Sequence, residues 1–306
     1  MLILDDVRTA QALPYATLVP AIAQAARELA TGKILAPERQ VVTIDQASVL
    51  LCMPAIGPDI GVTKLITVHA GNARHRLPAI QGEVVAFEAA TGRRLALLDG
   101  PTVTARRTAA MTLLGIETLA PRRPASALII GTGTQAAAHV DAMIGHLGIA
   151  RFWIAGSTRA SAERFGSRLK ERYRHLAMHP LAAETLERDL PETNLVVALT
   201  TSKTPVIPAR IAPETLAIGV GAFKPDMAEF PPELLRARRI VVDDLHGARH
   251  EAGDLIQANV DWSGVTALGS ILAGQAAPPH GVPVFKTVGQ AAWDLAAARV
   301  AVGNLM

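Results

Sequence analysis

The sequence has few of the residues on which several functional classes depend. Its 306 residues include one cysteine, Cys52, which excludes an internal disulfide framework and a zinc site built from cysteines. Aromatic residues make up only 4%, and the formal net charge of +3 comes from cations scattered along the chain. A nucleic-acid-binding surface would need clustered positive charge and aromatic rings for stacking, so we expect no nucleic-acid partner.

The sequence also lacks a long, uninterrupted apolar run. The uncharged stretch over residues 9–26 contains Pro14 and Pro20, so no membrane span is expected. The first residues become acidic at Asp5 and Asp6, where a signal peptide would be basic. Because half of the residues are apolar and 19% are charged, we expect a folded, cytoplasmic protein that does not associate with membranes.

Two different patterns meet near Pro121, and the chain is long enough for two domains. Before Pro121, apolar residues recur at helical spacing over residues 22–30, and Gly32 ends this predicted helix. Short runs typical of strands follow, separated by turn residues; they cover residues 40–44, 48–52, 62–69, 83–88 and 95–98. This pattern predicts a β-rich domain of largely antiparallel strands.

After Pro121, apolar runs alternate with helical segments. Residues 127–130 form a continuous apolar run, as in a strand that is buried on both faces. Helices are predicted over 135–146, 160–173 and 288–302, and further strands over 152–155, 195–199, 216–220 and 240–242. Strands that alternate with helices indicate βαβ units, so the fold class we predict is α/β, with a Rossmann-type doubly wound parallel sheet.

The strongest motif is Gly131-Thr-Gly133-Thr-Gln-Ala136, which lies between the predicted strand 127–130 and the helix that follows. The pattern G-x-G-x-x-A at this place is typical of a dinucleotide site. The glycines allow a tight turn and a close approach of the pyrophosphate, while the start of the helix offers unpaired N–H groups. The motif therefore predicts that a nicotinamide dinucleotide binds here.

The next predicted strand ends at residues that bear on the choice between NAD and NADP. An acid at this place would accept a hydrogen bond from the ribose 2′-hydroxyl of NAD. The sequence instead has Ser157, Thr158 and Arg159, and its first acid is Glu163. Hydroxyl groups and an arginine suit a 2′-phosphate, so the sequence favours NADP(H), with NAD(H) possible.

A pair of histidines, His246 and His250, follows Asp243 and Asp244 and superficially resembles a metal site. Spacing of four residues on a helix would place both imidazoles on one face. However, Gly247 lies between them, directly after a predicted strand, where we expect no regular helix. We therefore predict no metal site.

Several segments match the pattern of a known family in the same order along the chain. They include Met53-Pro54, Gly61-Val-Thr-Lys64 and the segments 96–100, 104–110, 131–136, 199–202, 219–222 and 284–289. With these motifs the whole chain resembles the ornithine cyclodeaminase/mu-crystallin family. The resemblance implies a homodimer whose subunit has a dinucleotide-binding Rossmann domain, residues 121–287. It also implies a mixed α+β dimerisation and substrate domain formed by residues 1–120 and the C-terminal helix 288–306.

The resemblance also implies the site residues. Family members hold the carboxylate of an α-amino acid or its imine with three cations, which match Arg39, Lys64 and Arg107. Lys64 is in addition a candidate proton donor, although a lysine within a strand usually faces solvent. The expected cofactor-binding residues, including those of the glycine loop and of the strand end above, are Thr108, Gly131, Gly133, Thr134, Gln135, Ser157, Thr158, Arg159, Thr200, Thr201, Ser202, Val220 and Thr287.

Two positions indicate which reaction of the family to expect. Ornithine cyclodeaminases have a glutamate and an aspartate where this sequence has Leu51 and Phe223, and neither apolar side chain can move a proton. The mu-crystallin branch, which the sequence resembles more, reduces ketimines. We therefore predict an oxidoreductase that uses NAD(P)H to reduce a cyclic imino acid, Δ1-pyrroline-2-carboxylate or Δ1-piperideine-2-carboxylate, to the L-amino acid. Ornithine cyclodeaminase, an amino-acid dehydrogenase such as alanine dehydrogenase, and a non-enzymatic crystallin-like protein remain alternatives.

Overall fold

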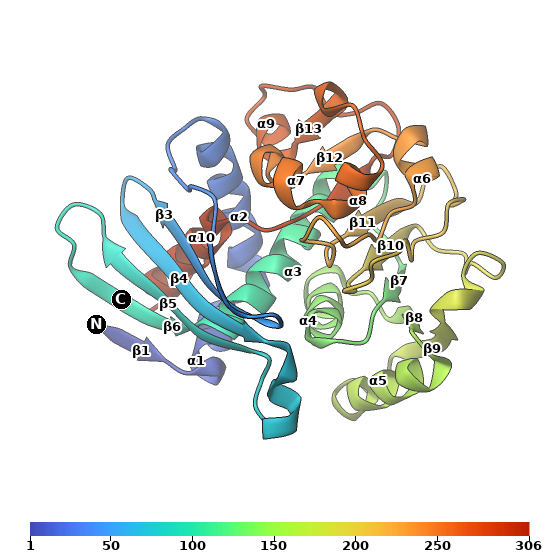
Figure 1. The fold of residues 1–306 in the computed structure, drawn as a ribbon, viewed down its shortest axis with the longest axis horizontal. Helices are drawn as coiled ribbons and strands as arrows, with labels where there is room; N and C mark the ends of the chain where they lie inside the picture. Colours follow the sequence, from blue (N-terminus) through green and yellow to red (C-terminus); the bar gives the residue numbers. More distant parts are fainter. Residues whose placement is uncertain (306) are drawn as a thin grey trace. The chain divides into compact units, whose positions relative to one another are not determined.

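The computed structural model describes residues 1–305, except the side chains of Ala70 and Ala73. Met306, the end of the C-terminal segment predicted over 288–306, lies outside the described residues. The chain divides into two compact units (Figure 1). The first consists of Met1–Met111 and Gly289–Met306, and the second is Thr112–Val288.

The first unit contains a six-stranded sheet in the order β1-β6-β5-β4-β3-β2. Its strands are β1 (Leu2–Leu4), β2 (Gln40–Asp45), β3 (Ser48–Ile56), β4 (Ile60–His69), β5 (Ile80–Glu88) and β6 (Arg94–Asp99). All neighbours pair antiparallel except β1 and β6, which pair parallel. The predicted antiparallel strands are therefore confirmed, and β1 is an addition.

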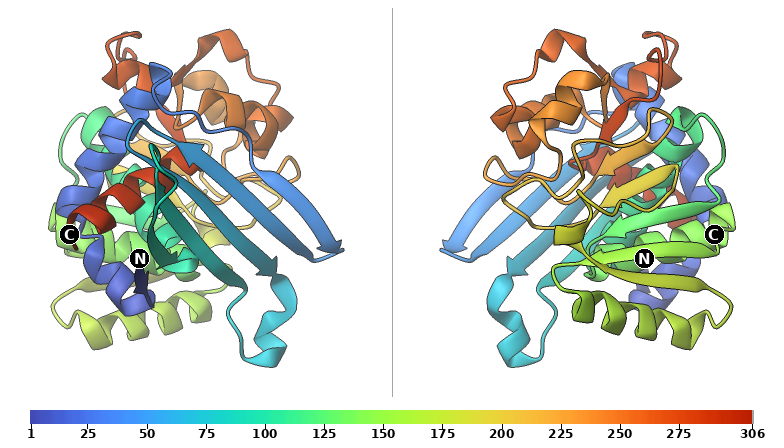
Figure 2. Two further views of the ribbon diagram at one scale, coloured as in Figure 1. Left: turned by 90° about the vertical axis from the view of Figure 1, so that its left-hand side faces the viewer. Right: turned by 90° about the vertical axis from the view of Figure 1, so that its right-hand side faces the viewer.

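Helices α1 (Asp6–Ala12), α2 (Tyr15–Ala30) and α10 (Ala291–Gly303) complete most of the first unit. Helix α10 packs on α2 and against strands β3 to β6 of the sheet (Figure 2). Ten of its residues are buried, including Trp293 and Asp294. The far end of the sequence thus supplies the central helix of the first unit.

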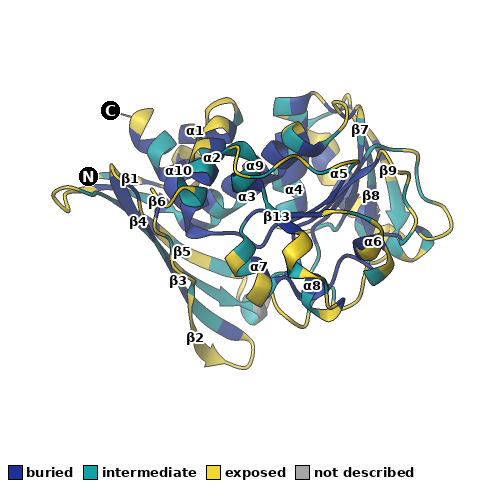
Figure 3. Cartoon of the chain, turned by 90° about the horizontal axis from the view of Figure 1, so that it is seen from above, coloured by how far each residue is buried: buried dark blue, intermediate teal, exposed yellow. Residues whose placement is uncertain are grey.

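Strand β2 forms an edge of this sheet and is exposed along its whole length (Figure 3). Its apolar residues Val41, Val42 and Ile44 are each more than half exposed, at 55%, 55% and 51%. An edge strand with exposed apolar side chains offers unpaired backbone groups and an apolar surface at the same place.

The second unit contains an eight-stranded, entirely parallel sheet, as predicted, in the order β13-β12-β14-β11-β10-β7-β8-β9. Its strands are β7 (Ser126–Ile130), β8 (Arg151–Gly156), β9 (Ala177–Ala182), β10 (Leu195–Ala198), β11 (Leu216–Gly219), β12 (Ile240–Val242), β13 (Val265–Ala267) and β14 (Val284–Lys286). The chain builds the sheet outward from β7 through β8 and β9, and then returns to place β10 on the other side of β7. The strand order therefore reverses between β7 and β10.

Short helices connect the strands of the second unit. They are α4 (Thr134–Ala142), α5 (Arg159–Arg172), α6 (Pro232–Ala237), α7 (Leu245–Glu251), α8 (Gly253–Gln257) and α9 (Leu268–Leu272). A π-helical turn, Met143–Leu147, continues α4 over the length predicted for this helix, and 3-10 turns lie at Ala183–Thr185 and Trp262–Gly264. A further 3-10 turn, Ala70–His75, belongs to the first unit. Within residues 1–305, no helix has both the length and the apolar character needed to cross a membrane.

Helix α3 (Gly100–Leu119) was not predicted. Residues 107–116 of this helix are buried without interruption, so its sequence has no polar face to mark a helical period. The boundary between the two compact units lies within α3, after Met111, whereas the sequence predicts a domain boundary after this helix, between residues 120 and 121.

Candidate functional site

The glycine loop lies where the strand order of the parallel sheet reverses. Gly131 directly follows β7 and has a φ of +124°, and a Cβ atom there would lie 2.6 Å from the carbonyl oxygen of Leu199. Leu199 follows β10, so the ends of the two strands come too close for any side chain at Gly131. In open α/β sheets, ligands bind outside the carboxyl ends of the strands at this type of reversal.

Helix α4 begins directly after the loop, with Gly133 as its N-cap. A glycine cannot cap the first N–H groups with a side chain, and a Cβ atom at Gly133 would meet no atom within 4 Å. The start of α4, at Thr134 and Gln135, therefore combines unpaired donors, the positive end of the helix dipole and open space. This chemistry fits the pyrophosphate of a dinucleotide.

The residues expected around the ribose follow β8 and are exposed. Thr158 is the N-cap of α5, and its hydroxyl accepts a hydrogen bond from the amide of Ser161 at 3.1 Å. The Nε atom of Arg159 lies 3.1 Å from Glu163 Oε1 in an ion pair that is exposed on both sides. Such a pair is worth about 0–1 kcal/mol, so Arg159 can exchange this partner for a ligand at little cost.

A buried glutamate that the sequence analysis missed, Glu229, holds the loops after β10 and β11. Its Oε1 accepts hydrogen bonds from the amide and the hydroxyl of Thr200 at 2.7 and 3.1 Å. Its Oε2 accepts one from the amide of Gly221 at 2.7 Å. Burial raises the pKa of Glu229, an effect that the charge of Lys286 opposes. Glu229 thus fixes both loops that carry expected cofactor residues, and no local motif marks it in the sequence.

The remaining expected cofactor residues differ in their surroundings. Val220 is buried, Thr201 is exposed, and the hydroxyl of Ser202 donates to the carbonyl of Thr204 at 2.6 Å. The hydroxyl of Thr287 donates to Asp243 at 2.7 Å, which gives Thr287 a structural contact of its own. Thr108, which is buried in α3, belongs to the first unit, whereas the other expected cofactor residues belong to the second.

In the first unit, two of the three expected carboxylate-binding cations share one partner. Lys64 is 1% exposed, and its Nζ lies 3.1 Å from Oδ1 and 2.9 Å from Oδ2 of Asp294. The Nε atom of Arg107 lies 3.1 Å from the same Oδ1. Asp294, in α10, therefore joins a strand and a helix that are distant in the sequence, and the sequence analysis did not single it out.

The third expected cation, Arg39, is connected to Arg107 through Gly289. A terminal nitrogen of Arg39 donates to the carbonyl oxygen of Gly289 at 2.9 Å. Gly289 has a φ of +85°, and a Cβ atom there would lie 2.8 Å from a terminal nitrogen of Arg107. Gly289 thus lies between the two guanidinium groups. We call Arg39, Lys64 and Arg107 the cation cluster.

The cation cluster changes the chemistry of its lysine. The pKa of Lys64 is lowered to about 8, because burial and the charges of Arg107 and Arg39 lower it by more than Asp294 raises it. Arginine does not lose its proton in proteins. Lys64 is therefore the member of the cluster that can give up a proton near neutral pH.

The two positions that separate the reactions of the family carry apolar side chains. Met53 lies opposite Lys64 in the sheet and Leu51 lies opposite Ile66, so Leu51 shares the buried face of Lys64 and lies diagonal to it. Phe223 belongs to the second unit, where the Nζ of Lys224 lies 5.8 Å from the centre of its ring. Neither position offers a group that could accept a proton from a substrate amine.

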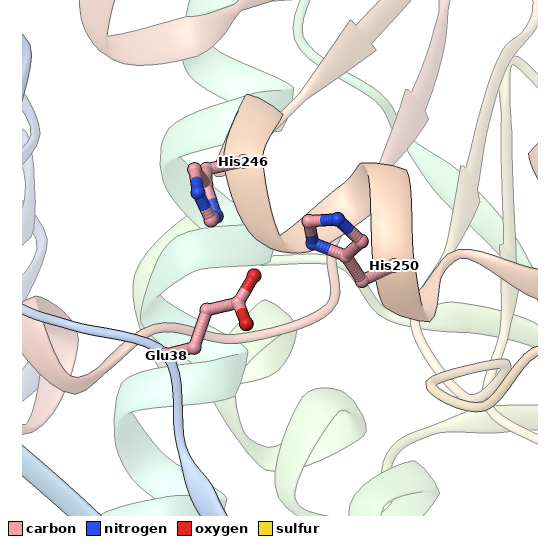
Figure 4. Close-up of side chains that lie close together, drawn as sticks. All are labelled: Glu38, His246 and His250. Carbon is pink, nitrogen blue, oxygen red and sulfur yellow. The ribbon is translucent and has the colours of Figure 1, made fainter.

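The prediction that no regular helix forms around Gly247 was wrong. Asp244 caps α7, which runs through Gly247, so His246 and His250 lie one turn apart with ring centres separated by 5.3 Å (Figure 4). The carboxylate of Asp243 accepts hydrogen bonds from Thr287 and from the amide of Val288. Both aspartates before the histidines therefore have roles in holding the backbone.

Comparison with known proteins connects these features to one family. The family model described as "Ornithine cyclodeaminase/mu-crystallin family" matches residues 1–306. The chain belongs to the ornithine cyclodeaminase/mu-crystallin family. This result agrees with the resemblance seen in the sequence motifs.

Among curated members of this family, Delta(1)-pyrroline-2-carboxylate reductase 2 of Burkholderia ambifaria is 45% identical over 298 residues, covering 97% of this chain and 94% of the relative. The Delta(1)-pyrroline-2-carboxylate/Delta(1)-piperideine-2-carboxylate reductase of Azospirillum brasilense is 43% identical over 300 residues, covering 98% and 94%. A solved structure of Thermococcus litoralis Delta(1)-pyrroline-2-carboxylate reductase with NADH and L-proline has a TM-score of 0.88 and 24% identity, covering 99% of this chain and 97% of that one. The similarity to this solved structure shows that the two proteins share a fold over 99% of this chain.

The two glycines of the phosphate loop should respond differently to a methyl group. Gly131→Ala forces a strained φ and a contact with Leu199, so we expect the free energy of unfolding to fall by about 2 kcal/mol or more. Gly133→Ala, with open space and an ordinary φ of −88°, should change it by less than about 1 kcal/mol. Urea unfolding of both variants measures the difference, and equal losses would contradict the close approach of β7 and β10.

Proposed function

We propose that the protein is an NAD(P)H-dependent reductase that converts a cyclic imino acid, Δ1-pyrroline-2-carboxylate or Δ1-piperideine-2-carboxylate, to the corresponding L-amino acid. The observation that carries this proposal is the cation cluster of Arg39, Lys64 and Arg107, which gathers around Asp294 and Gly289. Within this cluster, Lys64 and Arg107 are buried against one carboxylate, so positive charge remains to attract a substrate carboxylate. The names of the two curated relatives support the same reaction.

In this proposal, Arg39, Lys64 and Arg107 bind and orient the substrate carboxylate. Charge-assisted hydrogen bonds to guanidinium groups fix the plane of a carboxylate, and a fixed substrate lowers the entropic part of the barrier. When bound, the nicotinamide supplies a hydride to C2 of the protonated imine, so the C=N bond becomes a C–N bond and the cofactor is oxidised. Lys64 is the group we assign to hold the proton that the substrate nitrogen needs.

The apolar character of Leu51 and Phe223 favours the reductase over ornithine cyclodeamination. Ring closure on ornithine requires a group that takes a proton from the side-chain amine and a group that assists loss of ammonia. Leu51 lies on the face of the sheet that carries Lys64, where it can pack against an already closed ring. We therefore prefer reduction of a cyclic imine to cyclodeamination or amino-acid dehydrogenation as the function.

We propose NADP(H) as the preferred cofactor, held by the glycine loop and α4 at the pyrophosphate. Ser157, Thr158 and Arg159 would hold the 2′-phosphate. They are exposed at the end of β8, and residues 156–159 contain no acid that would repel it. We place Thr108, Thr200, Thr201, Ser202, Val220 and Thr287 around the rest of the cofactor.

We also propose that the protein is a homodimer formed through the sheet of the first unit. Val42 is exposed on β2, and Leu65 on β4 is 46% exposed on the side of the sheet opposite to Lys64. A second copy would cover this apolar surface and the open edge of β2. The proposal places the dimer contact on the face that does not carry the cation cluster.

The reaction is tested with NADPH and Δ1-pyrroline-2-carboxylate, and separately with L-ornithine. We expect loss of NADPH absorbance with the imino acid and no ammonia from ornithine. Arg107→Ala should lower kcat/KM about 100-fold, because loss of a buried charged partner costs about 2–5 kcal/mol. Its neighbour Arg106, which contacts the carbonyl of Leu13 and the ring of Tyr15, gives the control Arg106→Ala with near-normal activity. Ammonia and proline from ornithine would refute the proposal.

The cofactor preference is tested with Arg159→Ala. We expect the KM for NADPH to rise about tenfold, equivalent to about 1.4 kcal/mol, because one charge-assisted contact to the 2′-phosphate is lost. The KM for NADH should not change. Arg164→Ala, which removes another exposed arginine of α5, is the matched control. An equal rise for both cofactors would argue against a 2′-phosphate site here.

The dimer is tested with Val42→Asp. A charge at the centre of an apolar contact should dissociate the homodimer, and the molar mass from light scattering should fall by half. An aspartate at an exposed position of the second unit, introduced as Arg164→Asp, serves as the control and should leave the mass unchanged. A wild-type protein that is a monomer at micromolar concentration would exclude this interface.

A further inference from the structure

Asp294 is an acidic partner of the cation cluster inside the first unit. Its side chain is fully buried, with 0% exposure, and it contacts Lys64 with both oxygens and Arg107 with Oδ1. Its partners are 230 and 187 residues away in the sequence, on β4 and on α3. Neither the family resemblance nor the proposed function gives this residue a role.

The way in which Asp294 contacts Arg107 is informative. The ion pair uses Nε, so it does not consume the two terminal amino groups of the guanidinium. These terminal groups lie beside Gly289, whose carbonyl oxygen accepts a hydrogen bond from Arg39. Asp294 therefore contacts Arg107 at Nε and leaves its two terminal nitrogens beside Gly289, the residue that Arg39 also contacts.

Charge explains why such a residue is needed. Burial of a cation without a counter-ion is costly, and like charges at close range add repulsion. The charged groups with the largest effects on the pKa of Lys64 are Asp294, Arg107 and Arg39, while its neighbours across the sheet are the uncharged Met53 and Val84. Asp294 alone among these groups offsets the repulsion between the cations.

We propose that Asp294 is a positioning residue for the proposed reaction: it holds Lys64 and Arg107 in place, keeps Lys64 charged, and so prepares the cation cluster for the substrate carboxylate. The inference rests on the proposed function for its kinetic consequences only. Asp294 does not contact the reacting atoms in this scheme; it acts through the two cations. A purely structural role as an anchor of α10 is the competing explanation.

The chain offers a matched control for that competing explanation. Arg299, also on α10, anchors this helix through ion pairs of 2.6 Å to Asp59 and 2.7 Å to Glu28. Asp59→Asn therefore weakens the hold on the same helix and leaves the cation cluster intact. Comparison of Asp294→Asn with Asp59→Asn separates positioning of the cluster from anchoring of the helix.

The first measurement uses no substrate. The chain has six lysines, so 13C NMR of protein labelled at lysine Cε gives few signals, and Lys64→Met assigns the one from Lys64. We expect this signal to titrate with a midpoint near pH 8 in the wild type and in Asp59→Asn. In Asp294→Asn the midpoint should move to lower pH by about one to three pH units, because an attractive charge is lost.

The second measurement is kinetic. For Asp294→Asn, we expect the KM for Δ1-pyrroline-2-carboxylate to rise at least about tenfold and the alkaline limb of kcat/KM to move to lower pH. The Kd for NADPH should stay unchanged. A normal KM and a normal Lys64 titration in folded Asp294→Asn would overturn the proposal. If the NMR shift appears but the wild type does not reduce the imino acid, the proposed substrate is wrong and the role of Asp294 in the cluster stands.

A double variant keeps the test valid if Asp294→Asn does not fold. Removal of both partners of a buried ion pair costs less than removal of one, so Lys64→Met/Asp294→Asn should be more stable than Asp294→Asn. In the Lys64→Met protein, Asp294→Asn still removes the contact with Arg107, so we expect the Kd for pyrrole-2-carboxylate, a planar ring carboxylate, to rise, whereas Asp59→Asn in the same protein should leave it unchanged. Equal Kd values for Lys64→Met and Lys64→Met/Asp294→Asn, measured by calorimetry, would overturn the proposal.

Discussion

The contact of one buried carboxylate with two buried cations is the interaction on which the first unit depends. Asp294 compensates Lys64 and Arg107 in a place with almost no access to water. Because one carboxylate faces two cations, positive charge remains, and the proposed substrate carboxylate would neutralise it. The same contact fixes the register between α10, α3 and β4, so the packing of the unit and its proposed capacity to bind an anion have one cause.

The second unit uses a buried carboxylate in a different way. Glu229 accepts hydrogen bonds from backbone amides of Thr200 and Gly221, which begin the loops after β10 and β11. It therefore determines the shape of the main chain, whereas Asp294 determines the position of side chains. Next to these loops, the contact between Gly131 and Leu199 brings the ends of β7 and β10 together. The proposed cofactor site is thus shaped by the backbone, and the proposed substrate site by charge.

Local signals in the sequence were sufficient for much of this description. A continuous apolar run followed by Gly131 and Gly133 marks a strand, a tight turn and a helix, because each signal lies within a few residues of the next. The antiparallel strands were predicted for the same reason. Helix α3 was missed because burial on all sides removes the polar face that reveals a helix, and α7 was misjudged because the cap provided by Asp244 outweighs the cost of Gly247.

The site residues that were missed have another property in common. Asp294 and Glu229 each act on groups brought close only by the fold, and nothing in their own neighbourhood in the sequence distinguishes them from other acids. Lys64 itself was found through the resemblance, since a lysine within a strand ordinarily lies at the surface. The structure adds the reason for its burial, which is a counter-ion 230 residues away.

The division of the chain into units has a consequence for biosynthesis. The second unit is one continuous stretch, whereas the first needs both the segment before it and the segment after it. A ribosome completes the entire parallel sheet before it makes α10, so the second unit can fold while the nascent first unit still lacks its central helix. Until α10 is made, Lys64 and Arg107 lack Asp294 as a counter-ion. Assembly of the cation cluster around Asp294 is therefore expected among the last events in the folding of this protein.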